Sequence, residues 1–199
     1  MQPRVRFATE SDASAILEIY SPIVLNTATS FEVEPPSEQE MRTRITETMI
    51  DYPWLVCEGD RILGYAYASK HRVRPAYKWS VDVSVYAHQP AQRRGIGRAL
   101  YTALFQMIKL QGYCNAFAGI TLPNPASVGL HESLGFTLIG IYKSVGYKLG
   151  SWHDVGWWQL RLKNSLEPPE KLKKLSEVKD TDQFQFAISK GESLIKSTN

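Results

Sequence analysis

The sequence predicts an α/β protein of the α+β kind, in which about four helices flank a mixed central sheet of about seven strands. Three observations lead to this fold class. Along the chain, stretches in which apolar residues recur with the period of a strand alternate with stretches in which they recur with the period of a helix. Two strand patterns are separated only by Gly59-Asp60-Arg61, which predicts an antiparallel hairpin. A further strand pattern leads through a glycine-rich loop into a long helical pattern.

Two predicted helices and three predicted strands make up the first part of the chain. Thr9 precedes Glu10-Ser11-Asp12 and an apolar helical face, which is typical of a helix start. Ser37 and Glu40 have the spacing of a capping box, so a second helix should begin there and reach about residue 49. The strands are expected at residues 5–8, 54–58 and 62–69.

Further strands and helices are predicted in the second part of the chain. Apolar and polar residues alternate over residues 79–86, which places Asp82 on the polar face of that strand. Gly112 ends the long helix that follows, and Asn124 before Pro125 has the pattern of an N-cap. These elements are expected at residues 79–86, 95–111, 116–121, 124–135, 136–142 and 152–162.

Composition limits the class of protein. The chain has 199 residues, of which 43% are hydrophobic and 22% charged, so it is long enough for one domain and an extension. The net charge of +3 comes without a long basic tract, and we predict no nucleic-acid partner.

We find no signal peptide and no membrane span, and expect a cytoplasmic protein. Cys57 and Cys114 have no metal-ligand spacing, so we predict buried thiols and no metal.

Residues 164–199 differ in character from residues 1–163. Pro168-Pro169 breaks the pattern, and the following segment is rich in Lys, Glu, Asp and Ser, with only weak helical patches. We therefore predict one domain over residues 1–163 and a polar C-terminal extension, partly helical or disordered, over residues 164–199. Its composition favours a mobile tail, and a contact with a partner or a second subunit is the alternative.

Residues 92–99, Gln-Arg-Arg-Gly-Ile-Gly-Arg-Ala, are the most informative segment. Gly95 and Gly97 let the backbone turn closely, and backbone amides at the start of a helix point outward without partners. The helix dipole and the three arginines of the segment add positive charge. This combination predicts a binding site for a pyrophosphate. An ordinary glycine-rich turn with solvated arginines is the alternative.

The segment matches neither of two common phosphate-binding loops. Leu100 stands where a dinucleotide fingerprint needs a third small residue, and no Lys-Ser/Thr pair follows Gly97 as in a nucleotide P-loop. The spacing of Gln92, Gly95 and Gly97 is instead similar to the Gln/Arg-x-x-Gly-x-Gly/Ala motif of the GNAT superfamily of acyl-CoA N-acyltransferases. In that superfamily the loop holds the pyrophosphate of coenzyme A, so the resemblance implies a GNAT fold and acetyl-CoA as co-substrate.

Several segments resemble one branch of that superfamily, the phosphinothricin N-acetyltransferases, also described as methionine sulfone or sulfoximine acetyltransferases. The matched segments follow the order of the family and span about residues 3–163, whereas the extension is not covered. They are Tyr52-Pro53-Trp54-Leu55-Val56, Ala76-Tyr77-Lys78-Trp79, Ser84-Val85-Tyr86, Leu122-Pro123-Asn124, residues 127–136 and residues 152–160.

The resemblance implies transfer of an acetyl group from acetyl-CoA to the amino group of a small amino acid analogue. An ammonium group must lose a proton before it attacks a thioester. Asp82 stands at the position of the family's catalytic carboxylate, which is usually Glu, and a half-exposed carboxylate paired with an arginine is the alternative. His131 stands where the branch has a catalytic histidine that protonates the leaving thiolate or helps to accept the amine's proton. A core histidine bonded to a backbone carbonyl is the alternative there.

The resemblance also assigns binding residues. The backbone of Val85, Tyr86 and Ala87 is expected along the pantetheine arm of the cofactor. Asn124 is expected at the acetyl end, although it is also a candidate N-cap, and Ser127 shares a helix face with His131. The remaining cofactor-binding candidates are Gln92, Arg93, Arg94, Gly95, Ile96, Gly97 and Arg98, and the acceptor-binding candidates are Phe31, Arg72, Arg74 and Tyr77.

Three functions are compatible with these patterns. We favour an acetyl-CoA-dependent N-acetyltransferase for a phosphinothricin-like or methionine sulfoximine-like amino acid. The alternatives are the same reaction on another small amine, such as a polyamine, an aminoglycoside or an ordinary amino acid, and a non-catalytic acyl-CoA-binding regulator. Arg72 and Arg74 argue against a polyamine, which would need an acidic pocket. The resemblance further implies a homodimer.

Overall fold

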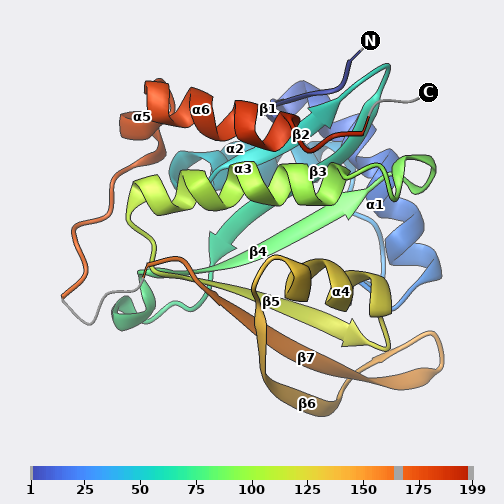
Figure 1. The fold of residues 1–199 in the computed structure, drawn as a ribbon. Helices are drawn as coiled ribbons and strands as arrows, with labels where there is room; N and C mark the ends of the chain where they lie inside the picture. The colour runs from blue at the N-terminus through green and yellow to red at the C-terminus, as the bar shows by residue number, and fades with distance from the viewer. Residues whose placement is uncertain (1, 164–167, 197–199) are drawn as a thin grey trace.

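The computed structural model describes residues 2–163 and 168–196, which form one mixed sheet with helices on both faces (Figure 1). Neighbouring strands follow the order β1-β2-β3-β4-β5-β7-β6, and the pair β4–β5 is parallel whereas the other pairs are antiparallel. The strands are β1 (Arg4–Phe7), β2 (Trp54–Glu58), β3 (Ile62–Lys70), β4 (Ser80–Ala87), β5 (Asn115–Leu122), β6 (Thr137–Lys148) and β7 (Ser151–Arg161).

The helices begin and end at the signals that the sequence carries. Ser37 Oγ accepts a hydrogen bond from the Glu40 amide, and the Glu40 carboxylate accepts one from the Ser37 amide, as in a capping box. Gly112, with φ 102°, ends the long helix. The helices are α1 (Ala13–Asn26), α2 (Glu38–Asp51), α3 (Ile96–Gln111), α4 (Pro125–Ser133), α5 (Leu175–Val178) and α6 (Asp182–Glu192), with 3-10 turns η1 (Glu10–Asp12), η2 (Pro75–Tyr77) and η3 (Gln89–Ala91).

Two apolar cores lie on opposite faces of the sheet. Alternate residues of a strand point to opposite faces, and accordingly Leu55 belongs to one core and Val56 to the other. The first core contains α3 with α5 and α6, and the second contains α1 and α2. Full burial of a side chain such as Leu104 contributes about 2 kcal/mol to stability.

The expected fold class is confirmed, and the chief difference in the sheet concerns one strand. The sequence predicts a strand that ends near residue 142, whereas β6 continues to Lys148. Ser144, with φ 48°, and an irregular register between Tyr142 and Gly146 interrupt the strand without ending its pairing with β7. The interrupted pattern is why the sequence alone suggested an earlier end.

The described part of the C-terminal extension packs against the domain instead of extending as a free tail. Figure 1 shows α6 lying along α3. Phe184 is fully buried and stacks on Phe7 of β1, with ring centroids 4.8 Å apart. A Cβ on Gly191 would lie 2.6 Å from the Ala99 carbonyl oxygen, so α6 and α3 approach closely. The Lys196 amide donates to the Arg94 carbonyl, 3.0 Å away. The extension therefore reaches the glycine-rich loop. The division of the chain into a domain over residues 1–163 and an extension over residues 164–199 stays a prediction.

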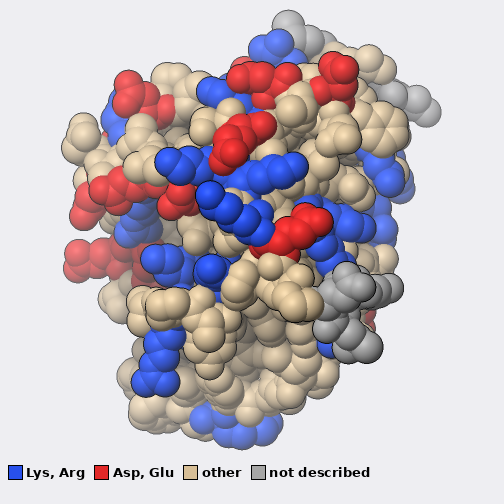
Figure 2. Space-filling view, turned by 90° about the vertical axis from the view of Figure 1, so that its left-hand side faces the viewer, with Lys and Arg blue, Asp and Glu red and all other residues tan. Residues whose placement is uncertain are grey.

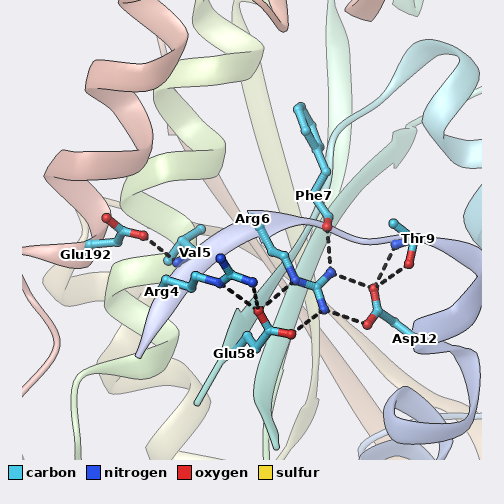
Figure 3. Close-up of polar contacts among 8 residues, drawn as sticks. All are labelled: Arg4, Val5, Arg6, Phe7, Thr9, Asp12, Glu58 and Glu192. Carbon is cyan, nitrogen blue, oxygen red and sulfur yellow. Dashed lines mark hydrogen bonds and ion pairs between the residues drawn. The ribbon is translucent and has the colours of Figure 1, made fainter. Parts of the chain in front are cut away.

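A group of charged residues joins β1 to its neighbours (Figure 3). Arg6 donates to both carboxylate oxygens of Asp12, at 2.7 and 2.8 Å, and also to Glu58. Arg4 donates to the same Glu58 carboxylate, 2.7 Å away. Glu192 of α6 accepts a hydrogen bond from the Val5 amide at 2.7 Å. This network, which we call the β1 network, fastens the edge strand to β2, to η1 and to the extension.

No helix in the described chain is long and apolar enough to cross a membrane.

Candidate active site

The parallel strands β4 and β5 separate halfway along their length, and a cavity opens between them. Their pairing runs from Ser80 with Asn115 to Asp82 with Phe117, and no further pair follows. The cavity has a volume of about 50 Å³ and its wall includes side chains from β4, β5, α3 and α4. We call it the splay cavity. Its lining includes Ser84, Val85, Tyr86, Tyr101, Gly119, Thr121, Asn124, Ser127 and His131.

The glycine-rich loop leads from η3 to the start of α3. Arg93 and Gly95 have positive φ angles of 64° and 83°, so the backbone bends sharply on both sides of Arg94. The helix begins at Ile96, and its first amides have no partners within the helix. The loop thus lies at the N-terminus of a 16-residue helix, where the helix dipole favours an anion, and the binding of a diphosphate there stays a prediction.

The predicted cofactor residues divide between this loop and the splay cavity. Arg98 turns away from the loop and donates to the Ser133 hydroxyl of α4, 2.6 Å away. Asn124 Oδ1 accepts a hydrogen bond from the Ser127 amide at 3.1 Å, so Asn124 is the N-cap of α4 and also lines the splay cavity. Val85 and Tyr86 line that cavity too, whereas Ala87 pairs with Gly64 farther along β4.

His131 lies in the wall of the splay cavity and is almost completely buried. Its Nδ1 is 2.7 Å from the Ser127 carbonyl oxygen, which can only accept, so Nδ1 carries the proton. Burial lowers the pKa of His131 and outweighs the hydrogen bond to Ser127, which raises it. The imidazole is therefore neutral near pH 7 and presents a bare Nε2.

Tyr101 of α3 is the partner of that bare nitrogen, and sequence reasoning missed it. The hydroxyl lies 3.1 Å from His131 Nε2, so Tyr101 donates to His131. Tyr101 also lines the splay cavity, and burial raises the pKa of its phenol. Residue spacing could not reveal this contact, because Tyr101 belongs to the apolar face of α3 by its pattern. The Nδ1 contact is the one that the core-histidine alternative predicts. His131 also lines the splay cavity, and its catalytic role stays a prediction.

Asp82 is the last residue of β4 that pairs with β5, at the point where the two strands separate. Its Oδ1 is 2.6 Å from Nδ1 of His71, the second site residue that sequence reasoning missed. Burial raises the pKa of Asp82, and the hydrogen bond from His71 and the charge of Arg72 offset only part of this effect. Asp82 is therefore a carboxylate with increased proton affinity and a histidine partner, whereas the alternative expectation paired it with an arginine.

Aromatic rings from three elements surround His71. Its ring stacks on Phe117 of β5, with centroids 4.3 Å apart and planes 13° apart. Tyr77 of η2 and Trp157 of β7 meet the same ring edge-on at 6.0 and 6.2 Å. Only 11% of the His71 side chain is exposed. A signal was available in the sequence, because His71 stands beside the cationic residues before the strand of Asp82, but nothing there indicated Asp82 as its partner.

The acceptor candidates lie in two neighbouring places. Arg72 lies 5.5 Å over the Trp157 ring and lines a cavity of about 200 Å³ together with His71, Phe117, Ile139, Gly140 and Tyr142, which we call the acceptor cavity. Tyr77 contacts His71. Phe31 instead packs against Gly146 and near His153, away from this group.

Arg74 lines a second, cationic cavity of about 340 Å³. Lys and Arg side chains gather on the face shown in Figure 2, with Asp and Glu between them. The cations that line the cavity are Lys70, Arg72, Arg74, Lys78, Lys173 and Lys174. Arg72 is shared with the acceptor cavity, so the positive charge is continuous between the two.

Other polar residues of the matched segments have structural roles. His153 Nε2 is 3.0 Å from the Lys148 carbonyl oxygen, and the Asp154 carboxylate accepts from Lys143 and from the Ser144 amide, both at 2.8 Å. These contacts hold the β6–β7 hairpin. No cluster of His, Cys, Asp and Glu suited to a metal ion occurs among residues 2–163 and 168–196.

Comparison with known proteins gives a consistent picture. Residues 5–157 match the family model of the acetyltransferase (GNAT) domain. The chain is 40% identical to a phosphinothricin N-acetyltransferase of Streptomyces viridochromogenes, over 78% of this chain and 85% of that protein. It is 34% identical to an L-methionine sulfoximine/L-methionine sulfone acetyltransferase of Salmonella typhimurium, over 82% of this chain and 97% of that protein.

A solved structure shares the fold over most of the chain. The GNAT superfamily phosphinothricin acetyltransferase of Sinorhizobium meliloti, in complex with acetyl-CoA, superposes with a TM-score of 0.81. It is 36% identical in sequence, and the match covers 85% of this chain and 94% of that one.

Proposed function

Because this chain belongs to the GNAT acetyltransferase family and is an N-acetyltransferase, we propose that it acetylates the free amino group of a small acidic amino acid analogue. The acceptors that we propose are of the phosphinothricin and methionine sulfoximine or sulfone type, which relatives at 34 to 40% identity are named for. Such a reaction would serve detoxification and resistance to a herbicide. The observation that carries this choice is Arg72, which lies beside the proposed base in the acceptor cavity.

The residues at the splay fit acetyl-CoA, which GNAT acetyltransferases use. The edge of β4 that faces β5 has no strand partner beyond Asp82, and it would offer backbone groups to an extended pantetheine arm, as to an added strand. The amides at the start of α3 and the loop from Gln92 to Gly97 would hold the diphosphate. When bound, acetyl-CoA supplies an activated acetyl group for transfer to an amine.

The acceptor cavity supplies recognition of an acid group. A guanidinium binds a carboxylate or phosphinate through two parallel hydrogen bonds, and Arg72 is available for this in the cavity wall. Trp157 and Tyr142 form the apolar part of the same wall. Phe117 of this cavity and Gly119 of the splay cavity are two positions apart on β5, about 7 Å. An amino acid held by Arg72 thus has its amine within reach of both sites.

Asp82 is the group that we propose to take the proton of the amine, either directly or through one water. Its increased proton affinity favours this role near neutral pH. We further propose that Tyr101 and His131, which are hydrogen-bonded in the wall of the splay cavity, hold the proton that the departing thiolate receives. Burial would keep this proton from exchanging freely with solvent.

The proposal extends to the assembly and the location of the protein. Large apolar side chains remain exposed along β6 and β7, which supports a homodimer formed through this hairpin. They are Leu138, Ile139, Ile141, Tyr142, Val145, Tyr147, Leu149 and Trp152. The free thiols of Cys57 and Cys114 support a location in the cytoplasm.

The proposal is tested by a steady-state screen of thiol release from acetyl-CoA. The acceptors are phosphinothricin, methionine sulfoximine, methionine sulfone, the common amino acids and a polyamine. We expect the acidic analogues to give the largest kcat/KM and the polyamine to give none above background. A preference for the polyamine would contradict the proposed role of Arg72. If only an ordinary amino acid gave thiol release, the acceptor would be that amino acid and not an acidic analogue.

A further inference from the structure

His71 is the single residue of the described chain that hydrogen-bonds the Asp82 carboxylate. The bond joins His71 Nδ1 to Asp82 Oδ1 at 2.6 Å, which is short for a nitrogen donor and typical of an ionised acceptor. Residues 2–163 and 168–196 offer no hydrogen bond to Oδ2. One oxygen of the carboxylate is therefore fixed, and the other is left for a substrate.

The imidazole is held in this position by packing from outside its own loop. Phe117 stacks on one face of the ring, while Tyr77 and Trp157 close its edges. These three residues come from β5, η2 and β7, so the ring cannot turn without moving several elements. Such support is what a precisely oriented hydrogen bond requires.

We propose that His71 is a positioning residue that fixes Asp82 Oδ1 and so directs Asp82 Oδ2 at the amine of the acceptor. This inference rests on the proposed function of Asp82 as the base. If the carboxylate of Asp82 rotated about its Cβ–Cγ bond, Oδ2 would move away from the amine. A displacement of about 1 Å from the reactive geometry costs about 100-fold in rate. The bond from His71 removes this freedom.

The proton transfer that follows is balanced without any further reagent. The N–H bond of the acceptor ammonium breaks, and an O–H bond forms at Asp82 Oδ2. The electron pair left on nitrogen forms the bond to the acetyl carbon, while the C–S bond of the thioester breaks and its pair goes to sulfur. The acetylated nitrogen then loses its second proton and the thiolate gains one, so the products are the amide, the thiol and a protonated Asp82 that returns its proton to water. His71 keeps its proton on Nδ1 throughout and continues to donate to Asp82 Oδ1.

Two substitutions separate positioning from packing. His71→Phe keeps an aromatic ring against Phe117 but removes the donor to Asp82. His71→Asn removes the ring but places an amide donor where Nδ1 stood. If His71 positions Asp82, we expect His71→Phe to lower kcat about 100-fold and His71→Asn to retain most of it. A role in packing alone predicts the reverse order.

The pH profile of kcat/KM gives a second measurement on the same proteins. The loss of the His71 hydrogen bond raises the pKa of Asp82, so the acidic limb of the His71→Phe profile should move to higher pH, whereas that of His71→Asn should stay near the wild type. The charged and titratable groups that face the pair are Arg72, Tyr77 and Tyr67 of β3, and all are unchanged in these variants.

A matched control is His153→Gln, which replaces a histidine whose hydrogen bond goes to the Lys148 carbonyl in the β6–β7 hairpin. It should leave kcat and the pH profile unchanged. Thermal unfolding and calorimetry with coenzyme A show whether each variant is folded and binds its cofactor. If His71→Asn is unfolded, the comparison uses His71→Gln, which also carries an amide donor.

The outcomes distinguish this inference from the function on which it rests. Full activity and an unmoved acidic limb in His71→Phe would overturn the positioning role and leave Asp82 as an unaided base. A wild-type enzyme that acetylates no acidic amino acid analogue would overturn the proposed function instead. A loss in His71→Phe with retention in His71→Asn supports both.

Discussion

Asp12 of the β1 network is buried and Asp82 of the candidate active site is half-buried, and each has a basic partner, yet their pKa values move in opposite directions. Burial raises the pKa of each carboxyl. At Asp12 the two hydrogen bonds from Arg6 and those from Thr9 outweigh burial, and the pKa falls below its usual range. At Asp82 one bond from His71 does not outweigh it, and the pKa rises.

The difference lies in the number of donors that the partner supplies. Arg6 is a permanent cation with a planar fork that satisfies both oxygens of Asp12. His71 satisfies one oxygen of Asp82 and leaves the other open. A fully satisfied carboxylate stabilises the fold and has little affinity for a proton, whereas a half-satisfied one keeps the affinity that a base needs.

The largest effect that we expect comes from removing the charge of Asp82. Asp82→Asn keeps the size of the side chain but cannot accept the amine's proton, so kcat/KM should fall about 1,000-fold. The affinity for coenzyme A, measured by calorimetry, should change less than about twofold, because the proposed cofactor contacts lie beyond the part of β4 that pairs with β5. Unchanged turnover would remove Asp82 from the mechanism.

The corresponding change in the β1 network should affect stability and not turnover. Arg6→Ala leaves Asp12 and Glu58 without their shared partner, and we expect the free energy of unfolding to fall by about 3 kcal/mol. Denaturant unfolding measures this loss. At a temperature where the variant is folded, its kcat should match the wild type, and a comparable fall in kcat would mean that the two regions are coupled.

The smallest effect is a difference in pH dependence. The Arg6 and Arg4 hydrogen bonds lower the pKa of Glu58 from 4.5 to about 2. A carboxyl group whose pKa is lower in the folded state than in the unfolded state stabilises the fold when the pH is above its unfolded-state pKa. For Glu58 this contribution is lost as pH falls from about 4.5 to about 2. Unfolding measured across this range should show a steeper loss in the wild type than in Arg6→Ala.

Activity should respond to pH in a separate range. As the proposed base, Asp82 must be ionised to accept a proton. Its pKa is raised above 3.8 whereas that of Glu58 is lowered from 4.5 to about 2, so the midpoint of the fall in kcat/KM should lie at a higher pH than the midpoint of the loss of the Glu58 contribution to stability. Coincident acidic limbs for turnover and unfolding would show that acid inactivates the enzyme by unfolding it, and the contrast between the two carboxylates would then have no functional meaning.

Local signals predicted much of the fold. The capping box at Ser37, the αL glycine at Gly112 and the N-cap at Asn124 all lie at helix ends as expected. Each depends on residues within a few positions of one another, so the chain carries the information locally. The weak helical patches of the extension became α5 and α6 only through burial of Phe184 and its neighbours, which composition could not reveal.

The sequence by itself determined the fold class through its periodicity and the glycine-rich loop through a short motif. The resemblance of its segments to a known family indicated the family and the candidates Asp82 and His131. Only the tertiary structure decided which partners these residues have. His71 meets Asp82 because the register of β3 and β4 places Ser69 opposite Asp82. Tyr101 meets His131 because α3 packs beside α4. Both contacts depend on distances between separate elements, which spacing along the chain does not specify.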